Sequence, residues 1–216
     1  CVDAVDAFLR NSPETREEFV KRNDIPDKPI VALLAGSRKQ EITANLPLML
    51  EAMKSYPGYQ PVIAGAPGID KDFYKPYLEE GACIVFGETY NILNNAHAAL
   101  VTSGTATLEA GIFRVPQVVC YATPLARLYS WLKKHFLKVK FVSLVNLVAD
   151  KEVVRELVAA DMTLENVKAE LGKILADGDG RKAMLDEYDR MLEILGEAGA
   201  SQRAARKIVS LLKERK

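Results

Sequence analysis

The sequence predicts an α/β fold: a three-layer domain around a parallel sheet, followed by helices at the C-terminal end. Short apolar runs alternate with segments of helical periodicity between residues 30 and 120. The runs are continuous, which is typical of strands buried on both faces of a parallel sheet. Strands that alternate with helices form βαβ units with right-handed crossovers. With 216 residues, 49% of them hydrophobic, the chain is long enough to build such a core.

The predicted elements follow one another without an internal repeat. Ser12, Pro13 and Glu14 have the order of an N-cap, a first-turn proline and an acidic first turn, so we expect a helix from there to about Asn23. Apolar runs predict strands at residues 30–34, 61–64, 83–86, 98–101 and 117–120. Helices are expected between them at residues 42–53, 71–79, 91–96 and 105–113.

The last part of the chain differs from this pattern. From about Lys151 onward it reads as helices only, with breaks at residues 161–163, 177–180 and 196–199. We therefore expect a Rossmann-like domain over residues 1–178 and a helical tail over residues 179–216, which packs on this domain, on a partner domain or on a second subunit in a homodimer. Cys1 stands in place of an initiator methionine before a helix-like segment, which favours a piece of a longer protein over an acylated lipoprotein.

Charge and cysteine content argue against several classes of protein. Lysine plus arginine and aspartate plus glutamate both number 29, so the overall charge gives no reason to expect a nucleic-acid partner. The three cysteines form no C-x-x-C pair, and two of them lie in apolar runs, which is typical of reduced thiols in a cytosolic protein. The sequence shows no apolar stretch of membrane-span length and no signal-peptide pattern.

Ligands of an open parallel sheet bind where strands end and helices begin, and one unusual turn of this kind follows the first predicted strand. It contains Gly36, Ser37 and Arg38, with Glu41 three residues later. Glycine lets the backbone approach a ligand, the next helix presents unpaired N–H groups, and arginine adds a planar cation suited to phosphate oxygens. By itself, such a tripeptide is more often an ordinary tight turn with Arg38 in solvent.

A second turn carries several hydroxyl groups around a glycine. Ser103, Gly104 and Thr105 would form a small anion site of backbone and side-chain donors at the start of a helix. Glu109 lies one helical turn beyond Thr105, and its carboxylate can accept two hydrogen bonds from a vicinal diol such as that of a ribose. An ordinary N-cap followed by a solvated glutamate is the alternative, and these residues alone leave both interpretations open.

Other motifs argue against common nucleotide, hydrolase and metal sites. Neither turn fits G-x-G-x-x-G or a P-loop, and Ala35 stands where a G-x-S-x-G elbow needs a glycine. Asp70 and Asp72 superficially resemble a metal-binding D-x-D pair, but they open a helix, where acidic residues are favourable. His97 and His135 are the only histidines and have no ligand spacing around them, so we expect no metal and no cofactor.

Together, the turns and the segments after them resemble one family, the lipid-A-disaccharide synthases. Residues 34–41 are similar to its L-P-G-S-R-x-x-E turn, and residues 103–109 to its S-G-T-A-x-L-E motif. Residues 116–121, 129–132, 141–147 and 152–157 resemble, in order, its P-M-V-V-x-Y strand, an aromatic helix, its Y-V-S-L-P-N-L segment and an E-x-V-x-E-L stretch. Ala35 and Val145 replace two family prolines.

The resemblance implies the C-terminal half of a GT-B glycosyltransferase, in which two Rossmann-like domains face each other across a cleft. It implies that the enzyme joins UDP-2,3-diacylglucosamine to 2,3-diacylglucosamine 1-phosphate, releases UDP and forms lipid A disaccharide 1-phosphate without a metal or cofactor. By this resemblance the N-terminal acceptor domain, which would supply the general base, is absent from the chain. The 216 residues are therefore expected to bind UDP but not to catalyse transfer.

The family motifs also assign roles by position. The turns at residues 36–38 and 103–105 would hold the pyrophosphate, Glu109 the ribose, and the loop at residues 87–90 would flank the uracil. Asn146 occupies a motif position to which the resemblance gives no defined role. The residues so assigned to the donor site are Gly36, Ser37, Arg38, Gly87, Glu88, Ser103, Gly104, Thr105, Glu109 and Asn146.

Residues 124–140 have the composition of a helix at a membrane surface, because basic and apolar or aromatic residues are interleaved and no acidic residue is present. The alternative, a core-facing helix with a solvated basic face, is the more common origin of such a pattern, and an acylated substrate makes the two interpretations about equally favoured. We therefore expect a cytoplasmic protein bound peripherally to the inner membrane of a Gram-negative bacterium. The residues expected to face the membrane are Arg127, Trp131, Lys133, Lys134 and Lys138.

Two other functions are compatible with the turns. One is another UDP-GlcNAc-using enzyme of the same architecture, such as the muramyl-peptide glycosyltransferase or a UDP-GlcNAc 2-epimerase. The other is a non-catalytic nucleotide-sugar-binding module, because fold alone does not decide function. The basic aromatic segment and residues 143–147 favour the lipid A enzyme.

Overall fold

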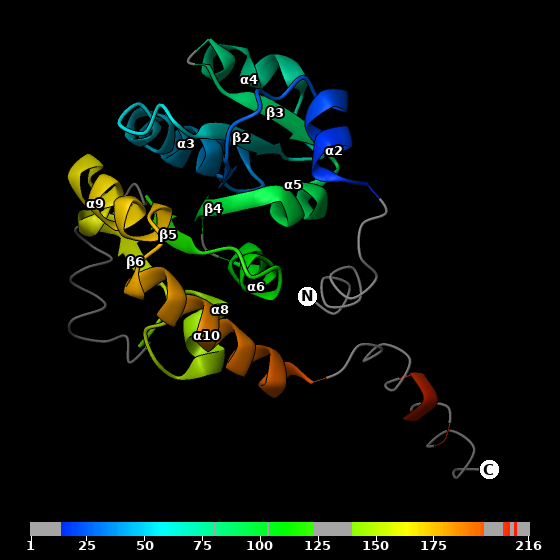
Figure 1. Cartoon of the computed structure of the whole chain (residues 1–216), viewed down its shortest axis with the longest axis vertical. Coiled ribbons are helices and arrows are strands. Elements are labelled where there is room, and N and C mark those ends of the chain that lie inside the picture. Colours follow the sequence, from blue (N-terminus) through cyan, green and yellow to red (C-terminus); the bar gives the residue numbers. More distant parts are fainter. Residues whose placement is uncertain are drawn as a thin grey trace.

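The computed structural model describes residues 14–79, 81–102, 104–122, 140–196, 205–207 and 210. A six-stranded parallel sheet in the order β3-β2-β1-β4-β5-β6 lies at its centre (Figure 1). The order reverses between β1 and β4, because β2 and β3 extend the sheet on one side and β5 and β6 on the other. The strands are β1 (Ile30–Leu34), β2 (Gln60–Gly65), β3 (Cys83–Phe86), β4 (Ala96–Val101), β5 (Gln117–Tyr121) and β6 (Arg155–Val158).

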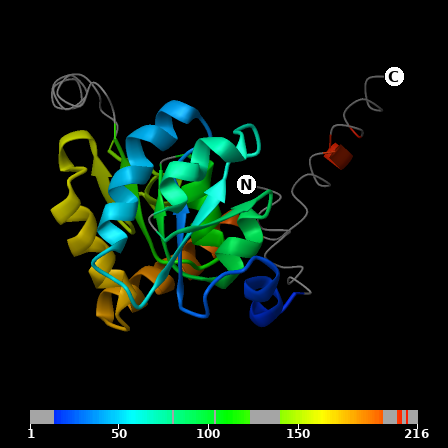
Figure 2. The same cartoon turned by 90° about the horizontal axis from the view of Figure 1, so that it is seen from above.

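Helices cover both faces of this sheet, as the two views show (Figures 1 and 2). The first face is covered by α2 (Arg16–Arg22), α5 (Thr89–Asn95), α6 (Thr105–Ile112), α8 (Leu144–Ala149) and α10 (Asp179–Leu195). The second is covered by α3 (Lys39–Met53), α4 (Lys71–Leu78) and α9 (Leu164–Leu175), and a 3-10 turn, η1 (Ala159–Asp161), precedes α9.

Strand β1 illustrates why a continuous apolar run suits this position. Successive side chains of a strand point to opposite faces. Ile30 and Ala32 therefore pack in the core of the first face, and Val31 and Leu33 in that of the second. All four are 0% exposed. The expected α/β class and all five predicted strands are thus confirmed, with the bounds of β1 and β3 unchanged.

The expectation of helices only after residue 151 is wrong, because β6 extends the sheet from Arg155 to Val158. This strand has four residues and begins with two charged ones, so it lacks the apolar run that marks the others. Leu157 and Val158 are buried, and the strand pairs in parallel with β5 at the edge of the sheet. Pairing with β5, which lies far away in sequence, decides the structure here.

The first described helix begins later than the sequence suggested. Glu14 lies in a bend, and the N-cap of α2 is Thr15. The Thr15 hydroxyl accepts from the Glu18 backbone N–H at 3.3 Å, while the Glu18 carboxylate accepts from the Thr15 N–H at 2.9 Å. This reciprocal capping box satisfies two N–H groups of the first turn. Ser12 and Pro13, on which the earlier start was based, lie outside the described residues.

The two positions that depart from the family prolines are both buried. Ala35 is 3% exposed and ends the β1 run in the core of the second face. Val145 is 0% exposed and lies in the first turn of α8, where the Ser143 hydroxyl accepts from the Asn146 N–H at 3.3 Å and caps the helix. The hydroxyl cap and the buried valine together define the start of α8 without a proline.

The first helix of the predicted tail packs on the sheet domain itself. Helix α10 begins at Asp179 and contacts α6, α8 and α9, and its Tyr188 and Met191 belong to the core of the first face. The segment expected to face the membrane, residues 127–138, lies outside the described residues, as does most of the chain after residue 196. No helix in the described ranges is long and apolar enough to cross a bilayer.

Candidate functional site

A cavity of about 300 Å³ opens at the carboxyl ends of β1, β2 and β4. It is lined by the turns that follow these three strands, and it therefore lies at the point where the strand order reverses. Open α/β sheets bind ligands at this point. Of the residues assigned from the sequence, the structure brings together here Gly36, Ser37, Arg38, Gly104, Thr105 and Glu109. Residues 64–67, the last two residues of β2 and the two that follow, also line the cavity and were not expected. Their position at the end of a strand was their only signal.

The turn after β1 is held by an acidic residue of the following helix. The Glu41 carboxylate accepts from the backbone N–H groups of Ser37, at 2.9 Å, and Arg38, at 3.3 Å. Gly36 has a φ of +116°, and a Cβ built on it would lie 2.6 Å from the Cβ of Glu41. Only glycine fits this position without strain or collision. The backbone donors of this turn are thus used within the chain, which leaves the Arg38 guanidinium as the group available to an anion.

Arg38 stands at the mouth of the cavity as a mobile cation. Its side chain is 81% exposed and pairs with Glu41 at 3.3 Å. Such an exposed pair contributes little to stability, so the guanidinium can turn toward a ligand at small cost. The other charged residues lining this cavity, within the described part of the chain, are Glu41 and Glu109. A bound anion would therefore depend on Arg38 and on helix N-termini for its favourable electrostatics.

The turn after β4 presents the N-terminus of α6 to the same cavity. Gly104 is the N-cap, with a φ of +123°, and Thr105 begins the helix. Thr107 in the first turn donates to the Gly104 carbonyl at 2.8 Å and accepts from the Leu144 N–H at 3.2 Å, which ties the turn to α8. Gly104, Thr105 and Ala106 line the cavity, so the positive end of α6 faces it. Ser103 lies outside the described residues.

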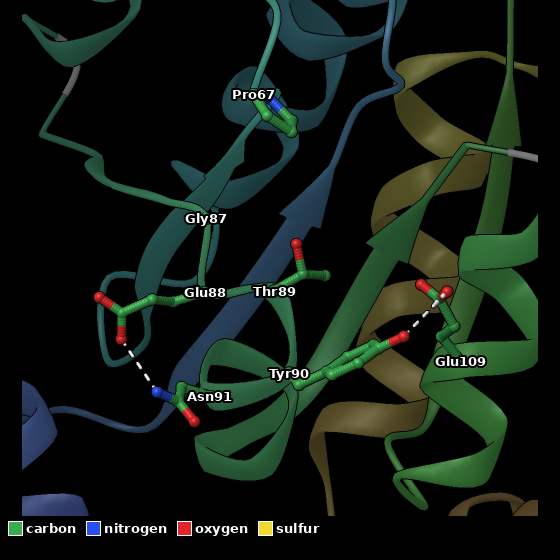
Figure 3. A pocket seen from close by; sticks show the side chains of 7 residues that line it. All are labelled: Pro67, Gly87, Glu88, Thr89, Tyr90, Asn91 and Glu109. Carbon is green, nitrogen blue, oxygen red and sulfur yellow. Dashed lines mark hydrogen bonds between the residues drawn. The ribbon is translucent and has the colours of Figure 1, made fainter. Parts of the chain in front are cut away.

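A second cavity, of about 470 Å³, shares Pro67, Thr89 and Glu109 with the first. Figure 3 shows its lining, which comes mostly from residues 87–91, the two-residue link after β3 and the first turn of α5. The Tyr90 hydroxyl donates to the Glu109 carboxylate at 3.5 Å, and the Tyr90 ring stacks on Phe113 with centroids 5.3 Å apart. Glu109 thus lies between the two cavities, with a tyrosine beside it.

Glu88, assigned to the nucleotide from the sequence, is already bonded within the chain. Arg22 donates to both of its carboxylate oxygens, at 2.8 and 2.6 Å, and Asn91 donates to one of them at 2.9 Å. These donors, Arg22 first, lower the pKa of Glu88 to about 2, so it stays ionised at neutral pH. In Figure 3 its side chain points toward Asn91 and away from Glu109. Glu88 therefore holds the start of α5 in place, and no local motif had pointed to Arg22 as its partner.

Asn146 is the one assigned residue, among those the structure describes, that lines neither cavity. It is 0% exposed. Its amide donates to the Val154 carbonyl and to Glu156, at 2.8 and 2.9 Å, and accepts from the N–H groups of Val153 and Val154. All its hydrogen-bonding capacity is thus used internally. Its assignment to the donor site is corrected: Asn146 joins α8 to β6.

Glu156 completes this junction from the first half of β6. Its carboxylate accepts from the backbone N–H groups of Val142, at 2.9 Å, and Ser143, at 2.8 Å, and from the Ser143 hydroxyl at 2.8 Å. A carboxylate at these groups satisfies the start of α8 and favours its dipole. Because Thr107 bonds to α8 at Leu144, the junction also supports the α6 turn that lines the cavity.

The acidic pair that resembled a metal motif is a helix cap. Asp70 is the N-cap of α4, and its carboxylate accepts from the Asp72 N–H at 2.8 Å. Asp72 pairs with Lys75 at 2.8 Å. Asp70 and Asp72 thus have the structural role that their place in the sequence predicted.

His97 lines neither cavity, and its ring bonds to the Leu175 carbonyl at 2.9 Å.

The fold has clear relatives among solved structures, at low sequence identity. The calicheamicin glycosyltransferase CalG4 matches 89% of this chain and 45% of its own, with a TM-score of 0.56 and 17% identity. A co-structure of S. aureus MnaA with UDP matches 97% of this chain and 52% of its own, with a TM-score of 0.60 and 15% identity. A putative UDP-N-acetylglucosamine 2-epimerase from Listeria monocytogenes matches 99% of this chain and 52% of its own, with a TM-score of 0.59 and 15% identity. These likenesses show the fold alone.

The sequence comparisons are more specific. The family described as lipid-A-disaccharide synthetase matches residues 5–209. The lipid-A-disaccharide synthase of Myxococcus xanthus is 39% identical over 209 residues, which cover 93% of this chain and 54% of that protein. The lipid-A-disaccharide synthase of Coxiella burnetii (strain CbuG_Q212) is 33% identical over 212 residues, which cover 94% of this chain and 56% of that protein. The chain therefore spans about half the length of these curated relatives. On this agreement along nearly its whole length, the chain belongs to the lipid-A-disaccharide synthase family.

Proposed function

We propose that this chain is the UDP-2,3-diacylglucosamine-binding domain of a hexosyltransferase that forms lipid A disaccharide 1-phosphate and releases UDP. The observation that carries the proposal is the pair of cavities that meet at Glu109, at the reversal of the strand order. One presents a cation and a helix N-terminus, as a pyrophosphate requires. The other is a loop-lined space of a size that accommodates a nucleobase. Membership in the family supports the choice of substrate.

In this arrangement the two ends of the nucleotide take different cavities. The pyrophosphate lies between Arg38 and the N-terminus of α6, and the uracil lies against residues 87–90. Glu109, which lines both cavities, then lies beside the ribose and can accept from its 2′- and 3′-hydroxyls. The Tyr90 hydroxyl, 3.5 Å from this carboxylate, orients it.

The same groups would assist departure of UDP when the sugar is transferred. Negative charge develops on the leaving pyrophosphate, and a fixed helix N-terminus with an arginine stabilises it without reorganisation of water. The acceptor hydroxyl needs a general base within hydrogen-bond reach. His97 does not serve, because its ring is bonded to Leu175 away from both cavities. We propose that a second, N-terminal domain supplies the base and the acceptor pocket.

The remaining parts of the proposal concern organisation and place in the cell. We propose a nucleotide-sugar domain over residues 1–178 and a C-terminal tail over residues 179–216 that can also pair with a second subunit. The basic aromatic residues 127–138 would bind the anionic surface of the inner membrane, where an acylated substrate resides. The composition of that segment supports this attachment.

The ribose assignment is tested by Glu109→Gln, which keeps the size of the side chain and removes its charge. Hydrogen bonds to a carboxylate contribute about 1.5–3 kcal/mol, so UDP affinity should fall roughly tenfold or more. The affinity for 2′-deoxy-UDP, which lacks one partner hydroxyl, should fall by a smaller factor. Calorimetric titration of both ligands measures the two factors.

The matched control is Glu51→Gln on α3, where an exposed carboxylate pairs with Lys54 at 2.7 Å away from both cavities. It should change neither affinity. Equal losses for UDP and its 2′-deoxy analogue in Glu109→Gln would contradict contact with the 2′-hydroxyl, and no loss for either would remove Glu109 from the site.

A further inference from the structure

We propose that Arg22 is a positioning residue for nucleotide-base recognition: its ion pair with Glu88 fixes the loop of Gly87 and Glu88, between β3 and α5, and thereby sets discrimination between bases. This inference rests on the proposed function, because it concerns the same cavity. Arg22 itself lines neither that cavity nor the one with the phosphate turns. It acts on the ligand through Glu88.

The planar guanidinium of Arg22 donates hydrogen bonds to two carboxylates, those of Glu88 and Glu14. Its two terminal nitrogens donate to the two oxygens of Glu88 at 2.8 and 2.6 Å. Its Nε and one terminal nitrogen donate to the two oxygens of Glu14 at 2.7 and 2.8 Å. Bidentate arginine–carboxylate pairs fix orientation as well as distance. A lysine, as a point charge, could not hold both carboxylates in this geometry.

Helix α2 gives Arg22 a firm base. Phe19 and Val20 of this helix are 0% and 6% exposed and belong to the core of the first face. The Ile25 N–H donates to the Val20 carbonyl at 2.9 Å, which anchors the chain just after the helix. The guanidinium also lies 5.9 Å from the centre of the Phe19 ring. Arg22 is thus a rigid support with a charged end directed at the loop, 66 positions away in sequence.

The link between β3 and α5 consists of Gly87 and Glu88, and the Glu88 carbonyl accepts from the Ile92 N–H at 3.0 Å where α5 begins. A Cβ built on Gly87, which has a φ of +73°, would meet nothing within 4 Å. Glu88 occupies the N-cap position of α5 but makes no capping bond with its side chain. Its carboxylate turns back to Arg22 and Asn91 instead. The ion pair with Arg22 is thus the contact that ties this link to α2 and sets the direction of the Glu88 side chain.

The effect should appear in binding rather than in stability. Exposed ion pairs contribute little to the free energy of unfolding, and the Arg22 side chain is 47% exposed. A loop that must be ordered by the ligand weakens binding, because its ordering entropy is subtracted from the affinity. A disordered loop also discriminates less well between the hydrogen-bonding groups of different bases. Uracil and cytosine differ only in the groups at ring positions 3 and 4, so the ratio of UDP to CDP affinity reports the position of the loop.

The experiment compares Arg22→Met with Arg16→Met on the same helix. Arg16 pairs with Asp27 at 2.7 Å and does not contact the loop, so this control removes the same charge from α2. UDP and CDP affinities are measured by calorimetry. We expect Arg22→Met to lower UDP affinity about fivefold to tenfold and CDP affinity by much less. Arg16→Met should leave both unchanged.

A double substitution separates action through Glu88 from general damage. If Arg22 acts through Glu88, Arg22→Met should add no further loss of UDP affinity in a Glu88→Gln background. Additive losses would overturn the proposal, as would equal weakening of UDP and CDP or an unaltered UDP affinity in Arg22→Met. Failure of the unaltered chain to bind UDP at all would instead reject the proposed function on which this inference rests.

Discussion

Replacement of Arg38 by alanine should lower UDP affinity by roughly tenfold to more than a hundredfold. A charge-assisted hydrogen bond to a phosphate contributes about 1.5–3 kcal/mol, and each 1.4 kcal/mol is a factor of ten. The loss should be near the upper end, because Glu41 already occupies the Ser37 and Arg38 N–H groups, and the turn has no other cation. The melting temperature should barely move, since the side chain is 81% exposed. Calorimetry and thermal unfolding measure the two quantities.

The matched control for this loss is Lys39→Ala, which removes the next cation along the chain. The Lys39 ammonium lies over the Phe73 ring, 5.6 Å from its centre, and the residue lines neither cavity. Lys39→Ala should leave UDP affinity within about twofold, because an exposed charge that lines neither cavity is screened by salt. If both variants lose the same affinity, the effect is one of net charge, and Arg38 makes no specific contact.

Gly36→Ala should damage both the fold and the site. The backbone at Gly36 has a φ of +116°, which L-residues rarely adopt, and the new Cβ would lie 2.6 Å from the Cβ of Glu41. Strain of this kind costs about 1–3 kcal/mol, and relief of the collision would move Glu41 from the N–H groups it caps. We expect a loss of about 2–4 kcal/mol in the free energy of unfolding and a loss of UDP affinity of tenfold or more.

Gly68→Ala is the matched control, because it makes the same substitution at a glycine with open space around it. A Cβ there would meet nothing within 4 Å, and its φ is not in the positive region. Alanine at such a position should be neutral or slightly stabilising, because it restricts the unfolded chain. Urea titration of both variants measures their free energies of unfolding. A Gly36→Ala protein as stable as Gly68→Ala would show that the turn after β1 is not under the constraint described here.

Most of the fold follows from local signals in the sequence. The runs at residues 30–34 and 83–86 became strands with unchanged bounds. A short continuous apolar run suits a strand covered on both faces, and all five residues of β1 are buried. Strand β6 was not predicted, because it contains no continuous apolar run. Arg155 and Glu156 are polar, and only pairing with β5 makes the segment a strand. Edge strands of this kind depend on long-range contacts that a local pattern does not contain.

The site could be predicted in part for a similar reason. Gly36, Arg38, Gly104 and Glu109 share one cavity because turns after strands of a parallel sheet meet at one edge, which is a property of the fold class. Asn146 was misplaced because a motif position does not tell whether an amide faces a ligand or the core. Its four internal bonds appear only once α8 and β6 lie together.

Arg22 shows the limit of such reasoning most clearly. It lies in a helix with four charged neighbours among residues 16–21, and nothing local separates it from Arg16 or Lys21. Its partner Glu88 is 66 positions away. The pairing results from the packing of α2 beside α5, on the face of the sheet that both helices cover. Long-range ion pairs of this kind leave no trace in periodicity or motif.

The central claim is that UDP binds where the carboxyl ends of β1, β2 and β4 meet, beside the residues that follow β3, and it can be tested residue by residue. In a two-dimensional NMR titration of the glycine-labelled chain with UDP, the amide signals of Gly36, Gly87 and Gly104 should shift together and saturate at one affinity. Those of Gly58, in the turn before β2, and Gly172, within α9, should stay in place. Shifts confined to Gly58 or Gly172, or no shift at any glycine in the folded protein, would contradict the account.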